Sequence, residues 1–395
     1  MRLTFGARGC PVCHGTKSEV LFRQRFEQLS GAHLLHGYDV SICARCGAGY
    51  ADKIPAQPAF DRYYRELSKY DFAEQVRKAP PSEQEKHADI AAVIEKFVPS
   101  RDARIFEIGS GSGQLLAALK SLGFTNLLAS DPSSGCVRSI QTSFGVPAIA
   151  FGMYDAEVPG PPFDFLILVG VMEHLRELDL AVARFHELVR HGGRVYLEVP
   201  DASRYAAGLD APFQEFSVEH INFFSAGSLK NSMQARGFRA VKTGQVMRAL
   251  HEASCPSVYG VFERTSGSLP IEPDTATESG LRSYIKDCEA EDSQLRARIS
   301  ESVPAGEKMI VWGVGAHTLR LLANRGLDPA QIDVFVDSNP IYQNRQLHGI
   351  PVISPAELND RQRPILISSR GFQREIQDQI QNGLRLPNPL ILLYD

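Results

Sequence analysis

The chain has 395 residues, of which 43% are hydrophobic and 22% charged, and its formal net charge is −4. This length exceeds what one hydrophobic core fills, so two or three domains of ordinary globular composition are expected. The small negative charge provides no basic field for nucleic acid or an anionic membrane, so we expect a small-molecule substrate.

The amino-terminal residues contain no apolar segment of signal-peptide length. The longest apolar run, FLILVGVM at residues 165–172, is too short to span a membrane. We therefore expect a cytoplasmic protein, and the sequence leaves its oligomeric state open.

Residues 1–78 are expected to form a small module held together by metal. Two Cys-x-x-Cys pairs, Cys10/Cys13 and Cys43/Cys46, are separated by 29 residues that include short β-like runs. Four thiolates can surround Zn²⁺ tetrahedrally and leave no position for a catalytic water, so the ion would be structural. Disulfides are disfavoured in a reducing compartment, and free thiols or a redox pair are the alternative interpretation.

Residues 79–265 alternate predicted strands and helices. An amphipathic helix is expected near the start, and continuous apolar strands are then separated by amphipathic helices, which indicates a parallel sheet covered on both faces. The last two strands of this part are expected to form an antiparallel edge pair. The predicted fold is therefore a doubly wound α/β domain. The expected strands are residues 104–109, 126–131, 163–170, 192–200, 239–247 and 257–265.

Residues 266–395 are expected to contain a linker, a charged helix at about 279–302 and a Rossmann-like α/β domain. A second glycine turn, with Gly313 and Gly315, is followed by a strand ending at Asp337. This turn lacks the full dinucleotide fingerprint, so a relic of the fold or a surface that closes over the substrate is preferred to an NAD site.

The segment RIFEIGSGSGQLL places Glu107, Gly109, Gly111 and Gly113 between a strand and a helix. Glycines permit a tight turn and close approach of a ligand, and the helix start offers free N–H groups. Asp131 ends the next strand, where a carboxylate can accept hydrogen bonds from a ribose diol. An acid before the first glycine would repel a pyrophosphate but suits the cationic amino acid end of S-adenosylmethionine.

The E-x-G-x-G-x-G pattern resembles motif I of class I methyltransferases. FDFLILVGVMEHL and ELVRHGGRVYLEVPD resemble their fourth and fifth strands. The resemblance implies that S-adenosylmethionine rests along the first glycine turn and that Asp131 holds its ribose. It also implies that the region of Tyr154 and Asp155 faces the adenine.

The segment FSVEHINFFS, residues 216–225, contains Glu219 and His220 among several phenylalanines. It follows the fifth strand, in the region that crosses the carboxyl ends of the strands, where doubly wound sheets bind ligands. An imidazole that titrates near neutral pH can remove the proton of a methyl acceptor, and Glu219 could orient the ring or bind substrate. The phenylalanines would keep water out. The alternative is a core histidine bonded to the backbone.

The whole chain resembles the three-domain sugar C-methyltransferases of deoxysugar biosynthesis. The resemblance rests on the Cys-x-x-Cys module, EIGSGSG, VWGVGAHT and GIPVISPAEL, and VEHINFFS is similar to the family's segment with a Glu-His pair. It implies that His220 is the base with Glu219 beside it, and that His174 of VMEHL is a further site residue. The acceptor would be carbon 3 of a nucleotide-linked 4-keto-6-deoxysugar, methylated through its enolate.

Three positions depart from that family. Ser217 occurs where the family usually has tyrosine, and Phe223 and Phe224 occur where tyrosine is frequent, so a phenol that would stabilise an enolate is missing there. Oxygen or nitrogen of a sugar therefore remains an alternative acceptor, and a non-catalytic binding or scaffold protein is an alternative of another class. The tyrosines that would cover the pocket, or else pack between modules, are Tyr63, Tyr64 and Tyr70.

Overall fold

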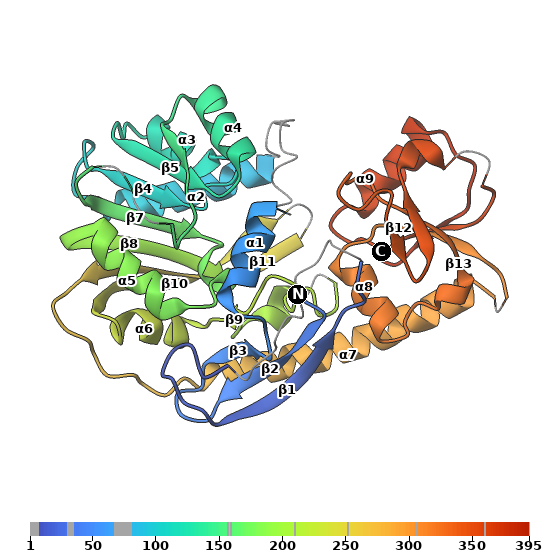
Figure 1. Cartoon of the computed structure of the whole chain (residues 1–395), viewed down its shortest axis with the longest axis horizontal. Coiled ribbons are helices and arrows are strands. Elements are labelled where there is room, and N and C mark those ends of the chain that lie inside the picture. The colour runs from blue at the N-terminus through green and yellow to red at the C-terminus, as the bar shows by residue number, and fades with distance from the viewer. Residues whose placement is uncertain are drawn as a thin grey trace. The chain divides into compact units, whose positions relative to one another are not determined.

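The structure is a computed structural model (Figure 1). The described residues are 8–29, 35–66, 81–155, 158, 160–208, 211–250, 253–304, 306–358 and 361–394. The chain divides into two compact units, and each is discontinuous in sequence. The first unit comprises Met1–Leu21, Val40–Gly208 and Glu219–Arg282, and the second comprises Phe22–Asp39, Leu209–Val218 and Ser283–Asp395. The domain boundaries expected at 78/79 and 265/266 stay predictions, and the first of them lies outside the described residues.

The first unit contains a seven-stranded sheet with the order β10-β11-β8-β7-β4-β5-β6. Its parallel strands are β4 (Ile105–Ile108), β5 (Leu127–Asp131), β6 (Ala148–Ala150), β7 (Phe163–Val169) and β8 (Val189–Pro200). The antiparallel edge pair is β10 (Phe238–Leu250) and β11 (Ala253–Arg264). The parallel sheet and its edge pair are as predicted. Of the seven strands, β6 alone had no predicted range, because it is too short to show a period; the resemblance implied only that a third strand precedes Tyr154.

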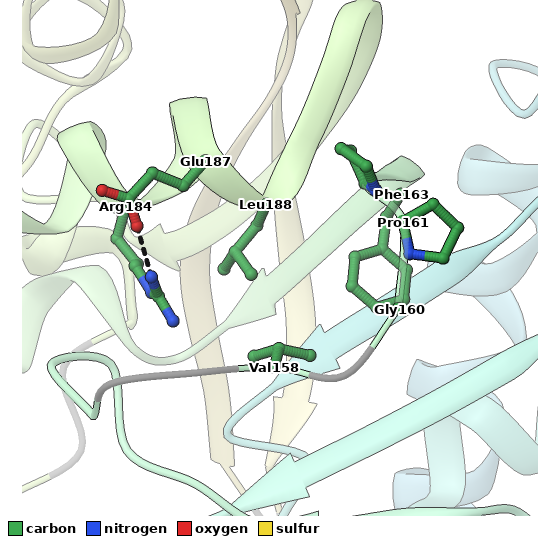
Figure 2. A pocket seen from close by; sticks show the side chains of 8 residues that line it. Val158, Gly160, Pro161, Phe163, Arg184, Glu187 and Leu188 are labelled. Carbon is green, nitrogen blue, oxygen red and sulfur yellow. Dashed lines mark hydrogen bonds and ion pairs between the residues drawn. The ribbon is translucent and has the colours of Figure 1, made fainter.

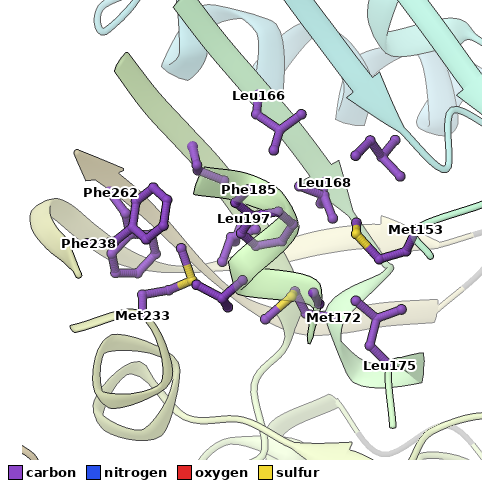
Figure 3. Close-up of a cluster of buried hydrophobic side chains, with 14 of the residues drawn as sticks. Met153, Leu166, Leu168, Met172, Leu175, Phe185, Leu197, Met233, Phe238 and Phe262 are labelled. Carbon is purple, nitrogen blue, oxygen red and sulfur yellow. The ribbon is translucent and has the colours of Figure 1, made fainter. Parts of the chain in front are cut away.

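Helices cover both faces of this sheet. One core cluster joins the sheet to α2 (Pro81–Glu95), α3 (Gln114–Ser121) and α4 (Ser134–Phe144). The other joins it to α5 (Leu178–Leu188) and α6 (Ala226–Gln234), and Figure 3 shows its buried side chains. Strands buried on both faces explain the continuous apolar runs of the sequence. This part of the chain is a doubly wound α/β domain, as expected from the sequence.

A smaller sheet has the strand order β1-β2-β3-β9. Its members are β1 (Ser18–Arg25), β2 (Gly37–Cys43), β3 (Gly49–Asp52) and β9 (Asn222–Phe223), and α1 (Gln57–Glu66) follows β3. Strands β3 and β9 pair antiparallel, with Gly49 opposite Phe223. The segment directly after His220 is therefore hydrogen-bonded to the cysteine-bearing part of the chain.

The long helix α7 (Ala276–Ser302) leads into the second unit, which contains a six-stranded sheet. Its strands, in spatial order, are β14 (Gln346–Leu347), β15 (Ile350–Ile353), β13 (Ile332–Val336), β12 (Met309–Trp312), β16 (Ile365–Ile367) and β17 (Leu390–Leu392). All neighbours pair parallel except β14 and β15. Helices α8 (Ala316–Ala323) and α9 (Gln373–Asp378) follow β12 and β16. Among the described helices of the chain, none is both long and apolar enough to cross a membrane.

Candidate active site

The first glycine turn connects β4 to α3, and Gly109, Gly111 and Gly113 all have positive φ. A Cβ atom added to Gly113 would lie 2.7 Å from Ile140 of α4, so a missing side chain lets the two helices pack closely. A Cβ atom on Gly111 would meet nothing within 4 Å. The backbone at Gly111 therefore faces open space, where a ligand can approach it.

Asp131 lies at the end of β5 and is anchored beside this turn. Its Oδ2 accepts a 3.0 Å hydrogen bond from the backbone N–H of Gly111, and its Oδ1 accepts one of 2.9 Å from Ser133. The side chain of Ser133 in turn caps α4. The carboxylate has a fixed position at the carboxyl ends of β4 and β5, as a ribose-binding acid requires.

Glu107 is a buried carboxylic acid in β4, with 4% of its surface exposed. Burial raises the pKa of Glu107 to about 8, and the nearby Asp131 also raises it. Its Oε2 has no hydrogen-bond partner among the residues that the structure describes. A buried carboxyl oxygen without a partner is costly unless a donor or a cation meets it. The residues around the turn therefore fit the cationic amino acid end of S-adenosylmethionine.

The region expected to face the adenine forms its own hydrogen bonds. Oδ2 of Asp155 accepts a 2.7 Å hydrogen bond from the backbone N–H of Gly152 and closes a short turn. The hydroxyl of Tyr154 donates to the backbone oxygen of Glu177 at 3.2 Å. Contact of Tyr154 and Asp155 with adenine remains a prediction.

The three predicted catalytic residues lie together. His174 follows β7 in a single 3-10 turn, Met172–His174, and its Nδ1 lies 3.0 Å from the backbone oxygen of Glu219. The ring of His220 meets the ring of His174 edge-on, with centroids 5.1 Å apart. The segment expected to cross the strand ends thus brings Glu219 and His220 to the turn after β7.

Backbone hydrogen bonds hold this segment on both sides. The N–H of Ile221 donates to the backbone oxygen of Glu173 at 2.9 Å, and the oxygen of Ile221 accepts from the N–H of Ala51 in β3 at 2.9 Å. The side chain of Asn222 donates to the backbone oxygens of Met172 and Leu175 at 2.8 and 2.7 Å. The position of His220 follows from these contacts.

Glu173 was not assigned to this cluster from sequence, and Tyr63 was expected only to cover the pocket or to pack between modules. The hydroxyl of Tyr63 in α1 donates a 2.9 Å hydrogen bond to Oε1 of Glu219. Glu173, which is 3% exposed, presents a ligand atom within 4.8 Å of His174 and His220. The sequence signal that could have identified Glu173 is a second Glu-His dipeptide, at residues 173–174. Tyr70 and the side chain of Tyr64 lie outside the described residues.

Two of the phenylalanines expected to shield the imidazole pack into cores. Phe224 belongs to the hydrophobic cluster on the α5 and α6 face of the seven-stranded sheet. In the second unit, Phe216 contacts Tyr284 edge-on at a centroid distance of 5.3 Å and lies against Phe22. Their large apolar surfaces are used for packing.

The four cysteines of the two pairs lie together and are all buried and unoxidised. The sulfurs of Cys10 and Cys46 are 3.6 Å apart, and those of Cys13 and Cys43 are 3.5 Å apart. Zn–S bonds of about 2.3 Å in a tetrahedron place sulfurs about 3.8 Å apart. Two backbone N–H groups also donate 3.4 Å hydrogen bonds to sulfurs of the cluster. The cluster can therefore hold a metal ion.

A pocket of 180 Å³ lies elsewhere on the first unit (Figure 2). It involves Phe163, the first residue of β7, and Leu188, the last residue of α5. Arg184 and Glu187 form an ion pair at this pocket. Phe163 is the first residue of β7, and His174 follows the last residue of that strand. The pocket therefore lies at the amino-terminal end of β7, away from the candidate active site.

Two family models match the chain. Residues 82–243 match a model described as a methyltransferase domain, and residues 305–391 match one described as C2185-like, N-terminal. The chain carries a class I S-adenosylmethionine-dependent methyltransferase domain. The matched range of the methyltransferase domain includes the first glycine turn, Asp131, His174 and His220. No curated protein matches the sequence at a significant level.

Several solved methyltransferases are similar to this chain at low identity. The 1,6-didemethyltoxoflavin-N1-methyltransferase of Burkholderia thailandensis is 19% identical, with 57% of this chain and 98% of that chain covered and a TM-score of 0.41. The magnesium protoporphyrin IX methyltransferase of Synechocystis is 15% identical, with 47% of this chain and 84% of that chain covered and a TM-score of 0.35. An N-methyltransferase of Bradyrhizobium japonicum is 13% identical, with 48% of this chain and 90% of that chain covered and a TM-score of 0.38. At these values the likeness says nothing about the acceptor of the methyltransferase domain.

Proposed function

We propose that this enzyme transfers the methyl group of S-adenosylmethionine to a nucleotide-linked keto-deoxysugar, with His220 as the general base. The supporting observation is the placement of Glu219 and His220 against the turn after β7, through the hydrogen bond between Ile221 and Glu173. The sequence resemblance to sugar C-methyltransferases supplies the substrate class.

The first glycine turn and its two acids are the proposed cofactor site. S-adenosylmethionine supplies an electrophilic methyl group on a sulfonium sulfur. In this proposal Glu107 accepts from the ammonium group, Asp131 accepts from the ribose hydroxyls, and the open backbone at Gly111 lets the cofactor lie close to the turn.

On the acceptor side, His220 takes the proton from carbon 3 of the sugar. The neighbouring keto group accepts the resulting negative charge as an enolate, and carbon 3 then attacks the methyl carbon while the electrons of the S–CH₃ bond remain on sulfur. Glu219, which accepts a hydrogen bond from Tyr63, and His174 orient the base and the sugar.

The cysteine cluster is proposed to hold one structural Zn²⁺. The spacing of the four sulfurs supports this assignment, and four thiolates leave no open position for chemistry. A module of this size has little core of its own, so metal binding would contribute to its folding.

Methylation of oxygen or nitrogen is the second candidate function. Ser217, Phe223 and Phe224 offer no phenol for an enolate, which favours an acceptor that needs none. Incubation with methyl-labelled S-adenosylmethionine and a panel of nucleotide sugars, followed by NMR of the products, separates the two. A methyl singlet on a quaternary carbon supports carbon methylation, and an O-methyl or N-methyl shift rejects it.

The base assignment is tested by His220→Ala. We expect this variant to bind S-adenosylmethionine normally and to lose turnover by about a hundredfold or more. His191→Ala removes an exposed imidazole of the same domain and is the matched control. Unchanged turnover in the His220 variant would exclude His220 as the base.

A further inference from the structure

Glu173, His174 and His220 form a compact set of potential metal ligands. One ligand atom from each side chain lies within 4.8 Å of the others. Glu173 and His174 are adjacent in the turn after β7, and the backbone hydrogen bond from Ile221 to Glu173 brings His220 to them. Two imidazoles and one carboxylate are a common ligand set of catalytic metal sites.

The hydrogen bonding of His174 favours a metal-binding form of its ring. Nδ1 lies 3.0 Å from the backbone oxygen of Glu219, and because a carbonyl can only accept, Nδ1 carries the proton and donates it. Nε2 then carries the lone pair. Metal-ligating histidines usually donate their other ring N–H in this way, to a carbonyl or a carboxylate.

The buried carboxyl group of Glu173 faces that lone pair. Its Oε1 lies 3.9 Å from Nε2 of His174, and only 3% of the residue is exposed. Within the described part of the chain, Oε2 of Glu173 accepts no hydrogen bond. A buried carboxyl group beside a nitrogen lone pair is unfavourable unless a proton or a metal cation lies between them.

We infer that Glu173, His174 and His220 bind a divalent transition-metal ion that directly contacts the methyl acceptor. Three protein ligands leave coordination positions open for an oxygen of the sugar. This arrangement differs from the cysteine cluster, whose four thiolates fill a tetrahedron. The mixed nitrogen and oxygen set suits Zn²⁺, Fe²⁺, Co²⁺ or Mn²⁺.

The inference rests on the proposed function and changes one role within it. A bound ion would stabilise negative charge on the acceptor oxygen, which is the task of the phenol that Ser217, Phe223 and Phe224 do not supply. With the ion bound, His220 would be a ligand, and Glu219 would replace it as the base. The cation would make the proton on carbon 3 more acidic, within reach of a carboxylate base.

Cobalt binding tests the site. The chain is stripped of metal, refilled with Co²⁺, and analysed for metal content and absorption. We expect two ions per chain in the wild type, and one in Glu173→Gln and in His174→Ala, with the thiolate-to-cobalt absorption of the cysteine cluster retained. His191→Ala should keep both ions. Thermal unfolding of each variant checks that it is folded, and His220→Asn is a second ligand variant if one fails to fold.

The outcomes separate this inference from the proposed function. One ion per wild-type chain at saturating Co²⁺, or two ions in the folded ligand variants, would overturn the cation site. Methyl transfer to a nucleotide sugar by a chain with one ion would overturn it as well and leave the proposed function standing. Two ions without transfer to any sugar of the panel would support the cation site and reject the proposed function.

Discussion

The backbone N–H of Gly111 donates a 3.0 Å hydrogen bond to the carboxylate of Asp131, which holds the first glycine turn against the neighbouring strand. The second unit contains the same relationship, because the N–H of Val314 donates to Asp337 at 2.8 Å. Only the first pair lies within the range matched by the methyltransferase family model. Asp337 is therefore a natural control for Asp131.

Asp131→Ala is expected to weaken S-adenosylmethionine binding by about tenfold or more, because it removes both the proposed ribose acceptor and the anchor of the turn. Calorimetry with S-adenosylmethionine and S-adenosylhomocysteine measures the change. Asp337→Ala should leave both affinities unchanged. Equal losses in the two variants would contradict the assignment of the cofactor to the first turn.

Glu107 is expected to make stability depend on pH in the absence of cofactor. Burial raises the pKa of Glu107 to about 8, so between its ordinary value and this pH the native protein retains a proton that the unfolded chain has lost. Stability from this group is complete at low pH and is lost as the pH rises through about 8. Each tenfold difference in proton affinity between the folded and unfolded states corresponds to about 1.4 kcal/mol.

Glu107→Gln should remove that dependence. Denaturant unfolding at several pH values should show the wild type losing a few kcal/mol relative to the variant between about pH 5 and pH 8. The variant should also bind S-adenosylmethionine more weakly, because it lacks the acid proposed to meet the ammonium group. Parallel pH profiles for the two proteins would disprove the titration.

Tyr63→Phe is expected to lower kcat by about tenfold, because Glu219 loses the 2.9 Å hydrogen bond that holds its carboxylate. The affinity for S-adenosylmethionine should stay the same, since Tyr63 is not part of the proposed cofactor site. Single-turnover kinetics with the accepted nucleotide sugar measures the effect. Tyr394→Phe, which removes a hydroxyl bonded to His317 in the second unit, is the control.

Cys43→Ser should lose one zinc per chain and lower Tm by roughly 10 °C, because a thiolate of the closed cluster is removed. Elemental analysis and calorimetric melting measure the two effects. Cys255→Ser changes a half-buried thiol outside the cluster and should keep the metal. Retention of zinc with an unchanged Tm in Cys43→Ser would show that the cluster holds no structural ion.

The parts of the fold that depend on local pattern could be predicted from sequence. Short local sequence patterns were enough to predict the first glycine turn, the apolar parallel strands and the antiparallel pair of β10 and β11. Strand β6, Ala148–Ala150, has too few residues for a period to appear. The cysteine cluster could be predicted because two Cys-x-x-Cys pairs are typical of metal-binding sites.

Contacts between residues that are distant in sequence could not be predicted. The proximity of Glu173 to His220 depends on a backbone hydrogen bond between segments that are distant in sequence, and the contact of Tyr63 with Glu219 depends on where α1 packs. Likewise, residues 22–39 and 209–218 join the second unit although both flank segments of the first. No local pattern carries such information.

Ile221 uses both of its backbone groups to connect other segments, since its N–H reaches the turn after β7 and its oxygen reaches the strand beside the cysteine cluster. A residue clamped in this way cannot swing outward without breaking bonds on two sides. The neighbouring His220 is therefore held in a fixed position. The proposed sugar acceptor would therefore have to enter the site past another segment of the chain.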